Sequence, residues 1–351
     1  MRVVNIGIIG MGHISNCYCQ NLNTVHENTR VIACADIDLE AARVKAEKWG
    51  IPQVVTVEQL LDMEQVEIVV NLTPPQNHYA ITRQCLLAGK HVYSEKPIAI
   101  TTAEADELVE LAKQKGLFLG CAPETNYGAG VSTAKALLEQ GAIGKVLYAD
   151  ARFRWPGDEN WHPNPAFLYQ KGAGPLFDRG PYFLNILVDL LGKAESVFAM
   201  TSVGFPTRTV TSEPRKGQVF PVETPSHVQS LIRFQNGVQV STTFSFDMKC
   251  PKEGAIELFG TEGSILITEP ISFGAPVYLC RNAEQFEQIP LVNDRTGNIR
   301  GYAVADMASA LSEGRTEHLA AGSRARHVVE IMEKTLQSAH DGKLYTIVSE
   351  P

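Results

Sequence analysis

Near its N-terminus the chain carries the segment Gly7-Ile8-Ile9-Gly10-Met11-Gly12-His13-Ile14-Ser15, which decides the fold of the first third. The segment ends a short apolar run, residues 3–9, that is typical of a buried parallel strand, and it opens a stretch with helical spacing. Gly10 and Gly12 match the first two glycines of the dinucleotide fingerprint, and Ser15 replaces the third. Without a Cβ, such glycines let the backbone approach a pyrophosphate at the positive end of a helix. The segment therefore predicts a dinucleotide site, with a tight turn that binds no ligand as the alternative.

Strands and helices alternate beyond this segment. Apolar runs predict further strands at 31–35, 66–72, 91–94 and 117–122, and helical spacing predicts helices at 13–22, 39–49, 81–88 and 102–115. Gly50 and Gly116 are expected to end two of these helices, and Thr101 with Glu104 forms a capping-box pattern before the last one. This alternation predicts a Rossmann domain, residues 1–122, with a doubly wound parallel sheet.

The second part of the chain shows a different pattern. Hairpins are predicted at 228–246, around Asn236-Gly237, and at 255–268. Helices are expected at 132–139, 182–191, 302–313 and 323–339. Residues 123–351 therefore read as an α+β domain, with a mostly antiparallel sheet covered by helices.

Composition excludes several classes of protein. The 351 residues include 31 Lys and Arg against 39 Asp and Glu, a formal net charge of −8, and no basic cluster that would attract nucleic acid. No apolar run approaches the roughly 18 residues of a membrane helix, and the N-terminus lacks a signal-peptide pattern, so we expect a cytoplasmic protein. Seven irregularly spaced cysteines without a C-x-x-C pair predict free thiols and no metal site.

Asp36 indicates which dinucleotide the protein binds, NAD or NADP. It lies 24 residues beyond Gly12, at the end of the second strand, where a carboxylate accepts hydrogen bonds from the adenosine ribose. A carboxylate there repels a 2′-phosphate, and Ile37 and Asp38 supply no cation. Arg43 is farther along the helix, where we expect it to be solvated. NAD is therefore favoured over NADP.

Two further strand ends carry candidate residues. Thr73 and Pro74 follow the third strong strand and are expected to line the cofactor site. Asn77 and His78 either cap the next helix or, for His78, act as a base. Lys96 follows the strand at 91–94, where its ammonium can donate to a substrate hydroxyl. The candidate cofactor-binding residues are Gly10, Gly12, His13, Ile14, Asp36, Ile37, Thr73, Pro74, Asn77, His78, Glu95, Lys96 and Pro97.

These motifs together resemble the Gfo/Idh/MocA oxidoreductases. The resemblance rests on the N-terminal fingerprint, on residues 71–78, on Ala88-Gly89-Lys90-His91-Val92 running into Glu95-Lys96-Pro97, and on the glycine-rich stretch at 172–182. It covers essentially the whole chain. It implies an NAD(P)-dependent enzyme acting on sugars or polyols, and an oligomer, a homodimer or homotetramer, formed through the C-terminal sheet.

The resemblance also implies roles for single residues. Lys96 is expected to bind the reacting hydroxyl, and Asp178 to orient the substrate or Lys96. Tyr182 stands where many members have a histidine acid/base, and Asn185 occupies a later position that is often Asp or Asn. Because an unperturbed tyrosine titrates near pH ~10, Tyr182 would need a nearby cation such as Lys96 to act as a base. The alternative for Tyr182 is an aromatic residue that only packs at the domain interface.

Residues 152–164 are rich in aromatic and hydrogen-bonding groups, as suits a wall for a sugar ring. From this stretch we expect Arg154, Trp161 and His162 to contact substrate, with His162 as the rival of Tyr182 for proton transfer. A surface loop pinned by its tryptophans is the alternative. Asn126, at the domain junction, is a further substrate candidate.

The sequence thus predicts hydride transfer between NAD and a secondary alcohol of a sugar, inositol or related polyol. Lys96 and Tyr182 would manage the hydroxyl proton, with Asp178 orienting them. Two alternatives stay open: an NAD-dependent glycoside hydrolase that works by oxidation and elimination, and a regulator that binds NAD and sugar without catalysis.

Overall fold

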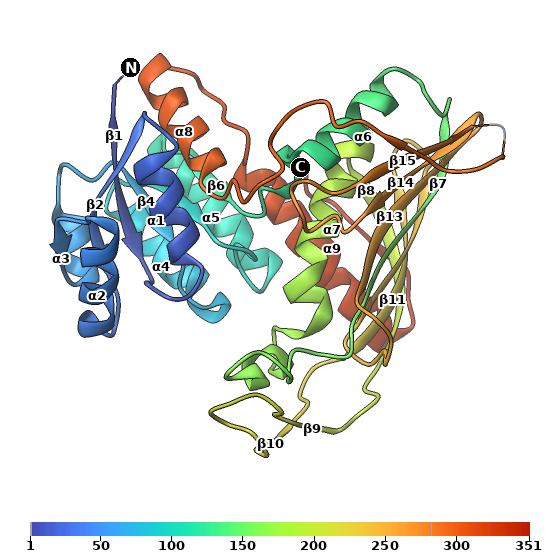
Figure 1. The fold of residues 1–351 in the computed structure, drawn as a ribbon, viewed down its shortest axis with the longest axis horizontal. Coiled ribbons are helices and arrows are strands. Elements are labelled where there is room, and N and C mark those ends of the chain that lie inside the picture. Colours follow the sequence, from blue (N-terminus) through green and yellow to red (C-terminus); the bar gives the residue numbers. More distant parts are fainter. Residues whose placement is uncertain (1, 282) are drawn as a thin grey trace. The chain divides into compact units, whose positions relative to one another are not determined.

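The computed structural model describes residues 2–281 and 283–351, coloured along the chain in Figure 1. The chain folds into two compact units. Unit 1 comprises Met1–Glu124 and Asn298–Val329, and unit 2 comprises Thr125–Gly297 and Glu330–Pro351. The sequence prediction placed everything after residue 122 in the second domain, whereas residues 298–329 pack with the first unit.

Unit 1 contains a six-stranded parallel sheet in the order β3-β2-β1-β4-β5-β6. This is the strand order of a dinucleotide-binding fold, so the predicted Rossmann domain is confirmed. The strands are β1 (Val4–Ile9), β2 (Thr29–Ala35), β3 (Gln53–Val54), β4 (Ile68–Asn71), β5 (His91–Ser94) and β6 (Leu119–Cys121). Strand β4 is buried along its whole length, as expected of a parallel strand covered on both faces.

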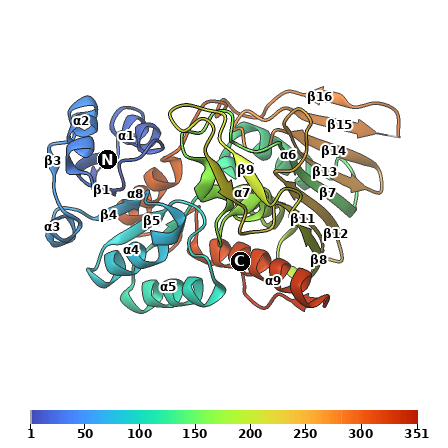
Figure 2. The same ribbon diagram turned by 90° about the horizontal axis from the view of Figure 1, so that it is seen from below.

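Helices cover both faces of this sheet. Helices α1 (Ser15–Thr24) and α2 (Leu39–Trp49) pack together, and α4 (Pro75–Leu87) packs with α5 (Thr102–Lys115) on the other face (Figure 2). Two further helices of unit 1 are α3 (Val57–Asp62) and α8 (Tyr302–Glu313). Thr101 and Glu104 form the predicted capping box, and Gly50 and Gly116 end their helices with φ of 65° and 64°.

Helix α4 starts six residues earlier than predicted, because Pro75 suits the first turn of a helix. Its N-cap is Pro74, without a side-chain cap among the described residues. The predicted capping role of Asn77 and His78 is therefore wrong.

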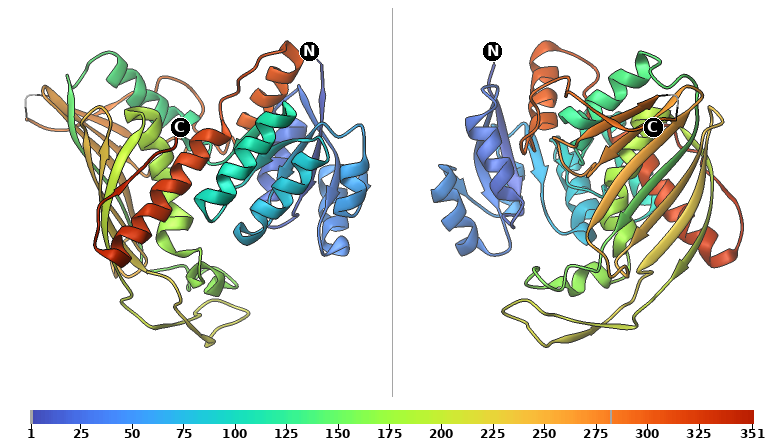
Figure 3. Two further views of the ribbon diagram at one scale, coloured as in Figure 1. Left: turned by 180° about the vertical axis from the view of Figure 1, so that it is seen from behind. Right: turned by 45° about the vertical axis from the view of Figure 1, so that its right-hand side comes forward.

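Unit 2 is built on a nine-stranded sheet in the order β16-β15-β14-β13-β7-β12-β11-β8-β17. Figure 3 shows this twisted sheet in two views. All neighbouring strands are antiparallel except β7 and β12, which are parallel. The strands are β7 (Val146–Arg154), β8 (Ala194–Ser202), β11 (His227–Phe234), β12 (Gln239–Ser245), β13 (Glu253–Gly260), β14 (Gly263–Thr268), β15 (Val277–Arg281), β16 (Glu287–Ile289) and β17 (Tyr345–Thr346). Both predicted hairpins, β11–β12 and β13–β14, are confirmed.

Helix α7 (Gly174–Leu191) carries Asp178 and Tyr182, two of the three residues that the sequence analysis placed in catalysis. It begins eight residues before the predicted start. Gly174, with φ of +81°, needs to be a glycine because a Cβ would lie 2.9 Å from the carbonyl oxygen of Pro225. The remaining elements of this unit include α6 (Ala129–Glu139), the short helices η1 (Thr125–Tyr127) and η2 (Pro165–Tyr169), and a ribbon of β9 (Thr207–Thr209) with β10 (Val219–Pro221); α9 (Gly322–Asp341) runs from unit 1 into unit 2.

Within the described ranges, no helix is both long and apolar enough to cross a membrane.

Candidate active site

The two fingerprint glycines of unit 1, Gly10 and Gly12, differ in the space around them. Gly10 has φ of +95°, and a Cβ there would lie 2.7 Å from the carbonyl carbon of Leu72 and 2.8 Å from the amide nitrogen of Thr73. At Gly12, by contrast, a Cβ would have no described atom within 4 Å. The fold therefore requires Gly10, whereas the space beside Gly12 is open. That open space, next to the first turn of α1, suits a pyrophosphate that approaches the backbone.

Asp36 is tied to the fingerprint turn. One carboxylate oxygen, Oδ2, accepts a hydrogen bond from the amide of Met11 at 2.6 Å, and Oδ1 accepts one from the amide of Asp38 at 3.0 Å. Ile37, the next residue, is fully exposed. The carboxylate is thus held at the end of β2 beside the turn, the position at which the sequence analysis expects the adenosine ribose.

Lys45 is a residue of this site that the sequence analysis missed. From α2 its ammonium donates to the carbonyl oxygen of Met11 at 2.5 Å and to that of Gly12. Partial burial lowers the pKa of Lys45. Arg43 is exposed, as the sequence analysis expected, and it pairs with Glu40 on the same helix. A lysine nearly two turns into the helix after β2 was the available signal for Lys45, but only the tertiary fold shows which way it points.

His78 joins two loops at the carboxyl edge of the sheet. Its Nδ1 lies 2.6 Å from the carbonyl oxygen of Pro97, and its Nε2 lies 2.6 Å from that of Thr73. The ring is 1% exposed, and this burial lowers the pKa of His78. Asn71, at the end of β4, accepts from the amide and hydroxyl of Thr73 and donates to the carbonyl oxygen of His78. His78 therefore positions the loops that carry Thr73 and Lys96, rather than presenting a base to substrate.

Lys96 follows β5 at the same edge, and its main chain is anchored from the interior. Its amide donates to Oε2 of Glu95 at 3.1 Å, and Oε1 of Glu95 accepts from the hydroxyl of Tyr18 at 2.8 Å. The Lys96–Pro97 peptide bond is cis. The remaining cofactor candidates, Gly12, His13, Pro74 and Asn77, are exposed at this edge, and Ile14 is half-buried.

Unit 1 contains a buried carboxyl at Glu124, which is 2% exposed. Glu124 accepts from the amides of Gly301 at 2.8 Å and Ala303 at 3.3 Å, so it holds the start of α8. Burial raises the pKa of Glu124 to about 7. The sequence analysis named Asn126, two residues further along the chain, but gave Glu124 no role.

In unit 2, Asp178 and Tyr182 lie one turn apart on the same face of α7. Asp178 forms an ion pair with Arg179, Oδ2 to Nε at 2.9 Å, and Arg179 also donates to Oδ2 of Asp158 at 3.0 Å. Oδ1 of Asp158 accepts from the indole N–H groups of Trp155 at 2.8 Å and Trp161 at 2.9 Å. Arg179 thus clamps two carboxylates together, and the sequence analysis gave it no role.

The structure places the residues of the predicted substrate wall on several elements of unit 2. Arg154 lies on β7 rather than in a loop, and its guanidinium pairs with Glu253 on β13 at 3.2 Å. Trp161 is exposed, with its indole N–H on Asp158. Nδ1 of His162 accepts from the amide of Asn164 at 3.0 Å. Asn126 is buried in η1. Residues 155–164 form a loop that is held together internally, because the indoles of Trp155 and Trp161 both donate to Asp158.

The predicted residues therefore gather in two groups. The cofactor candidates and Lys96 lie at the ends of β1, β2, β4 and β5 in unit 1. Asp178, Tyr182, His162, Trp161 and Asn126 belong to unit 2. In the part of the chain that the structure covers, no group of three or more His, Cys, Asp or Glu side chains is placed to hold a metal ion.

Comparison with protein families identifies both parts of the chain. Residues 4–122 match the oxidoreductase family with an NAD-binding Rossmann fold, GFO_IDH_MocA, and residues 131–266 match a GFO/IDH/MocA C-terminal domain. The chain belongs to the Gfo/Idh/MocA family. It is therefore an oxidoreductase that binds NAD, as the sequence predicted. The turn geometry at Gly10 and Gly12 and the carboxylate of Asp36 fit that cofactor.

Several known proteins are similar to this chain over different lengths. Mouse trans-1,2-dihydrobenzene-1,2-diol dehydrogenase is 28% identical over 320 residues, 89% of each chain. An uncharacterized oxidoreductase of Schizosaccharomyces pombe is 36% identical over 148 residues, 41% of this chain and 38% of that protein. A levoglucosan dehydrogenase, solved with NADH and L-sorbose, superimposes with a TM-score of 0.85 at 22% identity, covering 99% of this chain and 100% of that one. The last match shows a shared fold.

Proposed function

We propose that the protein catalyses reversible hydride transfer between NAD and a secondary alcohol of a sugar, inositol or related polyol. The observation that carries this proposal is the anchoring of Lys96 at the carboxyl end of β5, through Glu95 and through His78 at Pro97. Ligands of open α/β sheets bind at this edge. The names of the mouse diol dehydrogenase and the levoglucosan dehydrogenase support a hydroxylated ring as substrate.

When bound, NAD supplies the hydride acceptor. The ammonium of Lys96 donates a hydrogen bond to the reacting hydroxyl and stabilises negative charge on its oxygen as the proton leaves. Asp178, held by Arg179 at 2.9 Å, orients the substrate hydroxyl. The main task of these side chains is to place the donor carbon and to stabilise the developing alkoxide.

The proton acceptor is Tyr182, in its deprotonated phenolate form, rather than His162. Nδ1 of His162 accepts a hydrogen bond from the amide of Asn164, so the neutral ring carries its proton on Nε2 and offers no lone pair there. Tyr182 lies one helical turn from Asp178 on α7, which places its hydroxyl on the same face.

The test is NADH formation, followed by absorbance, with purified protein, NAD and a panel of sugars, inositols and polyols. Lys96→Met is expected to lose at least about 10²-fold in turnover while it still binds NADH. Tyr182→Phe is expected to lose turnover similarly, and the matched variant His162→Gln to keep most of it. Turnover that survives in Lys96→Met, or that disappears in His162→Gln but not in Tyr182→Phe, would contradict these assignments. A cytoplasmic location and a homo-oligomeric state stay predictions.

A further inference from the structure

Unit 2 contains a pocket of about 420 Å³ between the loop at 156–160 and strand β9. This volume lies within the range of small-molecule sites, about 300–1,000 Å³. Strand β9 and the residues after it contribute Thr207, Thr209 and Thr211 to the lining. Asn160 and Lys249 complete a wall of hydroxyl, amide and ammonium groups.

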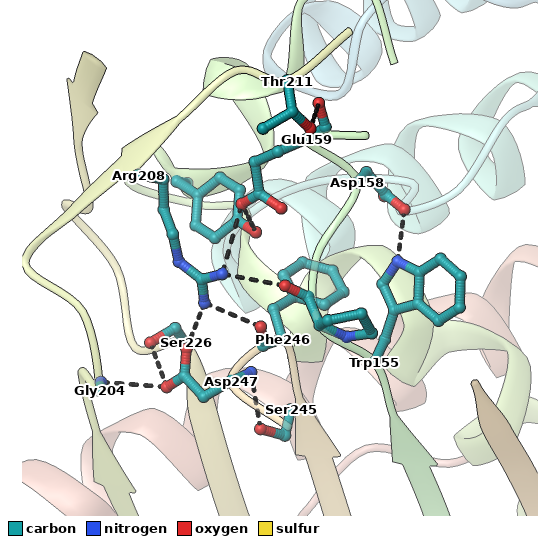
Figure 4. Close-up of polar contacts among 12 residues, drawn as sticks. Trp155, Asp158, Glu159, Gly204, Arg208, Thr211, Ser226, Ser245, Phe246 and Asp247 are labelled. Atoms are coloured by element: carbon teal, nitrogen blue, oxygen red, sulfur yellow. Dashed lines mark hydrogen bonds and ion pairs between the residues drawn. The ribbon is translucent and has the colours of Figure 1, made fainter. Parts of the chain in front are cut away.

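One arginine, with its side chain 10% exposed, fixes the floor of this pocket (Figure 4). Arg208 donates to the carbonyl oxygens of Pro156 at 3.0 Å and Phe246 at 2.8 Å. Its guanidinium lies 5.2 Å from the ring centre of Tyr169 and 4.9 Å from that of Phe205. Because both aromatic faces and both carbonyls hold the guanidinium in place, the floor is organised before any ligand arrives.

The charges of the pocket cancel. Arg208 pairs with Glu159 at 3.4 Å and with Asp247, whose other oxygen accepts from the hydroxyl of Ser226 at 2.7 Å. Lys249 adds a second positive charge. Two cations therefore balance two carboxylates. A phosphorylated or carboxylated ligand would find no excess of positive charge, whereas a neutral ring with many hydroxyl groups would find both donors and acceptors.

The pocket shares a loop with the site on α7. Its lining residues Gly157 and Glu159 flank Asp158, which accepts from Arg179, and Arg179 pairs with Asp178. Asp158 thus separates the pocket from the residues that we propose to orient the reacting hydroxyl. A ligand with two linked rings could place one ring on each side of this aspartate.

We infer that the pocket is a subsite for a second, neutral sugar ring, so that the preferred substrate is a disaccharide or other glycoside rather than a free monosaccharide. This inference rests on the proposed function for the reacting ring. It adds a specificity determinant in the loop at 156–160 and in β9, outside the residues that handle the proton and the cofactor.

The experiment compares kcat/KM for NADH formation from glucose with that from cellobiose, maltose and trehalose. The wild-type protein is expected to prefer one disaccharide at least tenfold. Thr209→Val and Lys249→Met are expected to lower this preference at least tenfold, through KM rather than kcat. The matched control is Lys216→Met. Lys216 is an exposed lysine between β9 and β10, and it does not line the pocket. Its preference ratio is expected to equal that of the wild type.

Calorimetric titration of the NADH-loaded protein with each disaccharide provides a readout besides turnover. Binding that Thr209→Val weakens, without turnover of any sugar, would support the subsite and overturn the proposed function. Turnover of glucose without a disaccharide preference, or a preference that neither variant changes, would overturn the subsite and leave the proposed function standing. Failure of all three disaccharides to bind would overturn the subsite, and tighter binding of glucose 6-phosphate that Lys249→Met abolishes would overturn its neutral character.

Discussion

Alanine substitutions at the two fingerprint glycines should separate a requirement of the fold from a requirement of cofactor binding. In Gly10→Ala the new Cβ would lie 2.7 Å from the backbone carbonyl carbon of Leu72, at a φ of +95°. Strained backbone costs about 1–3 kcal/mol, and forcing an atom into a packed site costs a further ~1–3 kcal/mol. We therefore expect a loss of about 2–6 kcal/mol in the free energy of unfolding, or at least roughly 4 °C in Tm.

Gly12→Ala should behave in the opposite way. Its Cβ would meet no described atom within 4 Å, and Gly12 is not among the residues with positive φ. The free energy of unfolding should change by no more than about 0.5 kcal/mol. The methyl group would, however, stand where the backbone approaches the pyrophosphate, so NADH affinity should fall at least tenfold, which is about 1.4 kcal/mol.

Urea unfolding of each variant and fluorescence titration with NADH provide the two measurements. Unchanged NADH affinity in Gly12→Ala would refute the placement of the pyrophosphate. Equal destabilisation of the two variants would refute the steric reasoning.

Three further outcomes follow from the contacts of charged side chains. Arg179→Met leaves Asp178 and Asp158 without their shared cation, and should cost about 3–5 kcal/mol in urea unfolding, whereas Arg43→Met, in an exposed pair, should cost less than about 1 kcal/mol. The pKa of Glu124 is raised to about 7 in the folded protein, so its contribution to the free energy of unfolding is present below the unfolded-state pKa of 4.5 and is lost as the pH rises through 7. The free energy of unfolding of the wild-type protein should therefore fall by up to about 3 kcal/mol between pH 4.5 and 8. The variant Glu124→Gln should lack this decline. Lys45→Met removes the donor to Met11 and should lower stability by about 1–3 kcal/mol and weaken NADH binding, both measurable in the same titrations; no change in either would contradict the role of Lys45.

Much of unit 1 could be predicted because its signals are local. The turn at Gly10, the capping box of Thr101 and Glu104, and the helix ends at Gly50 and Gly116 depend on residues within a few positions of each other. Such patterns act through backbone conformation and short hydrogen bonds, which a sequence displays directly.

Other features depend on contacts between distant segments. Strand β7 was not among the predicted strands, and residues 152–154 were considered only as part of a substrate wall or, alternatively, of a surface loop. Its buried residues include the small Ala149 and Ala151, which give a weak alternating pattern. The sequence analysis began this helix at residue 182 and did not extend it back to Gly174 and Pro175, because glycine and proline usually mark a turn or loop.

The hydrogen-bond and ion-pair partners of Lys45, Arg179 and Arg208 could not be predicted from the sequence either. Each joins segments that are distant along the chain, as in the contacts of Arg179 with Asp158 and of Arg208 with Pro156, which span 21 and 52 residues. No local spacing signals such a pair.

The most direct test of the central claim follows the hydrogen itself. The active sugar of the panel, with deuterium at every carbon-bound hydrogen, is incubated with the protein and NAD, and the NADH formed is analysed by mass spectrometry. Hydride transfer from a secondary alcohol carbon predicts one deuterium in each NADH. Unlabelled NADH, or cleavage of a glycoside without any net NADH, would contradict the account.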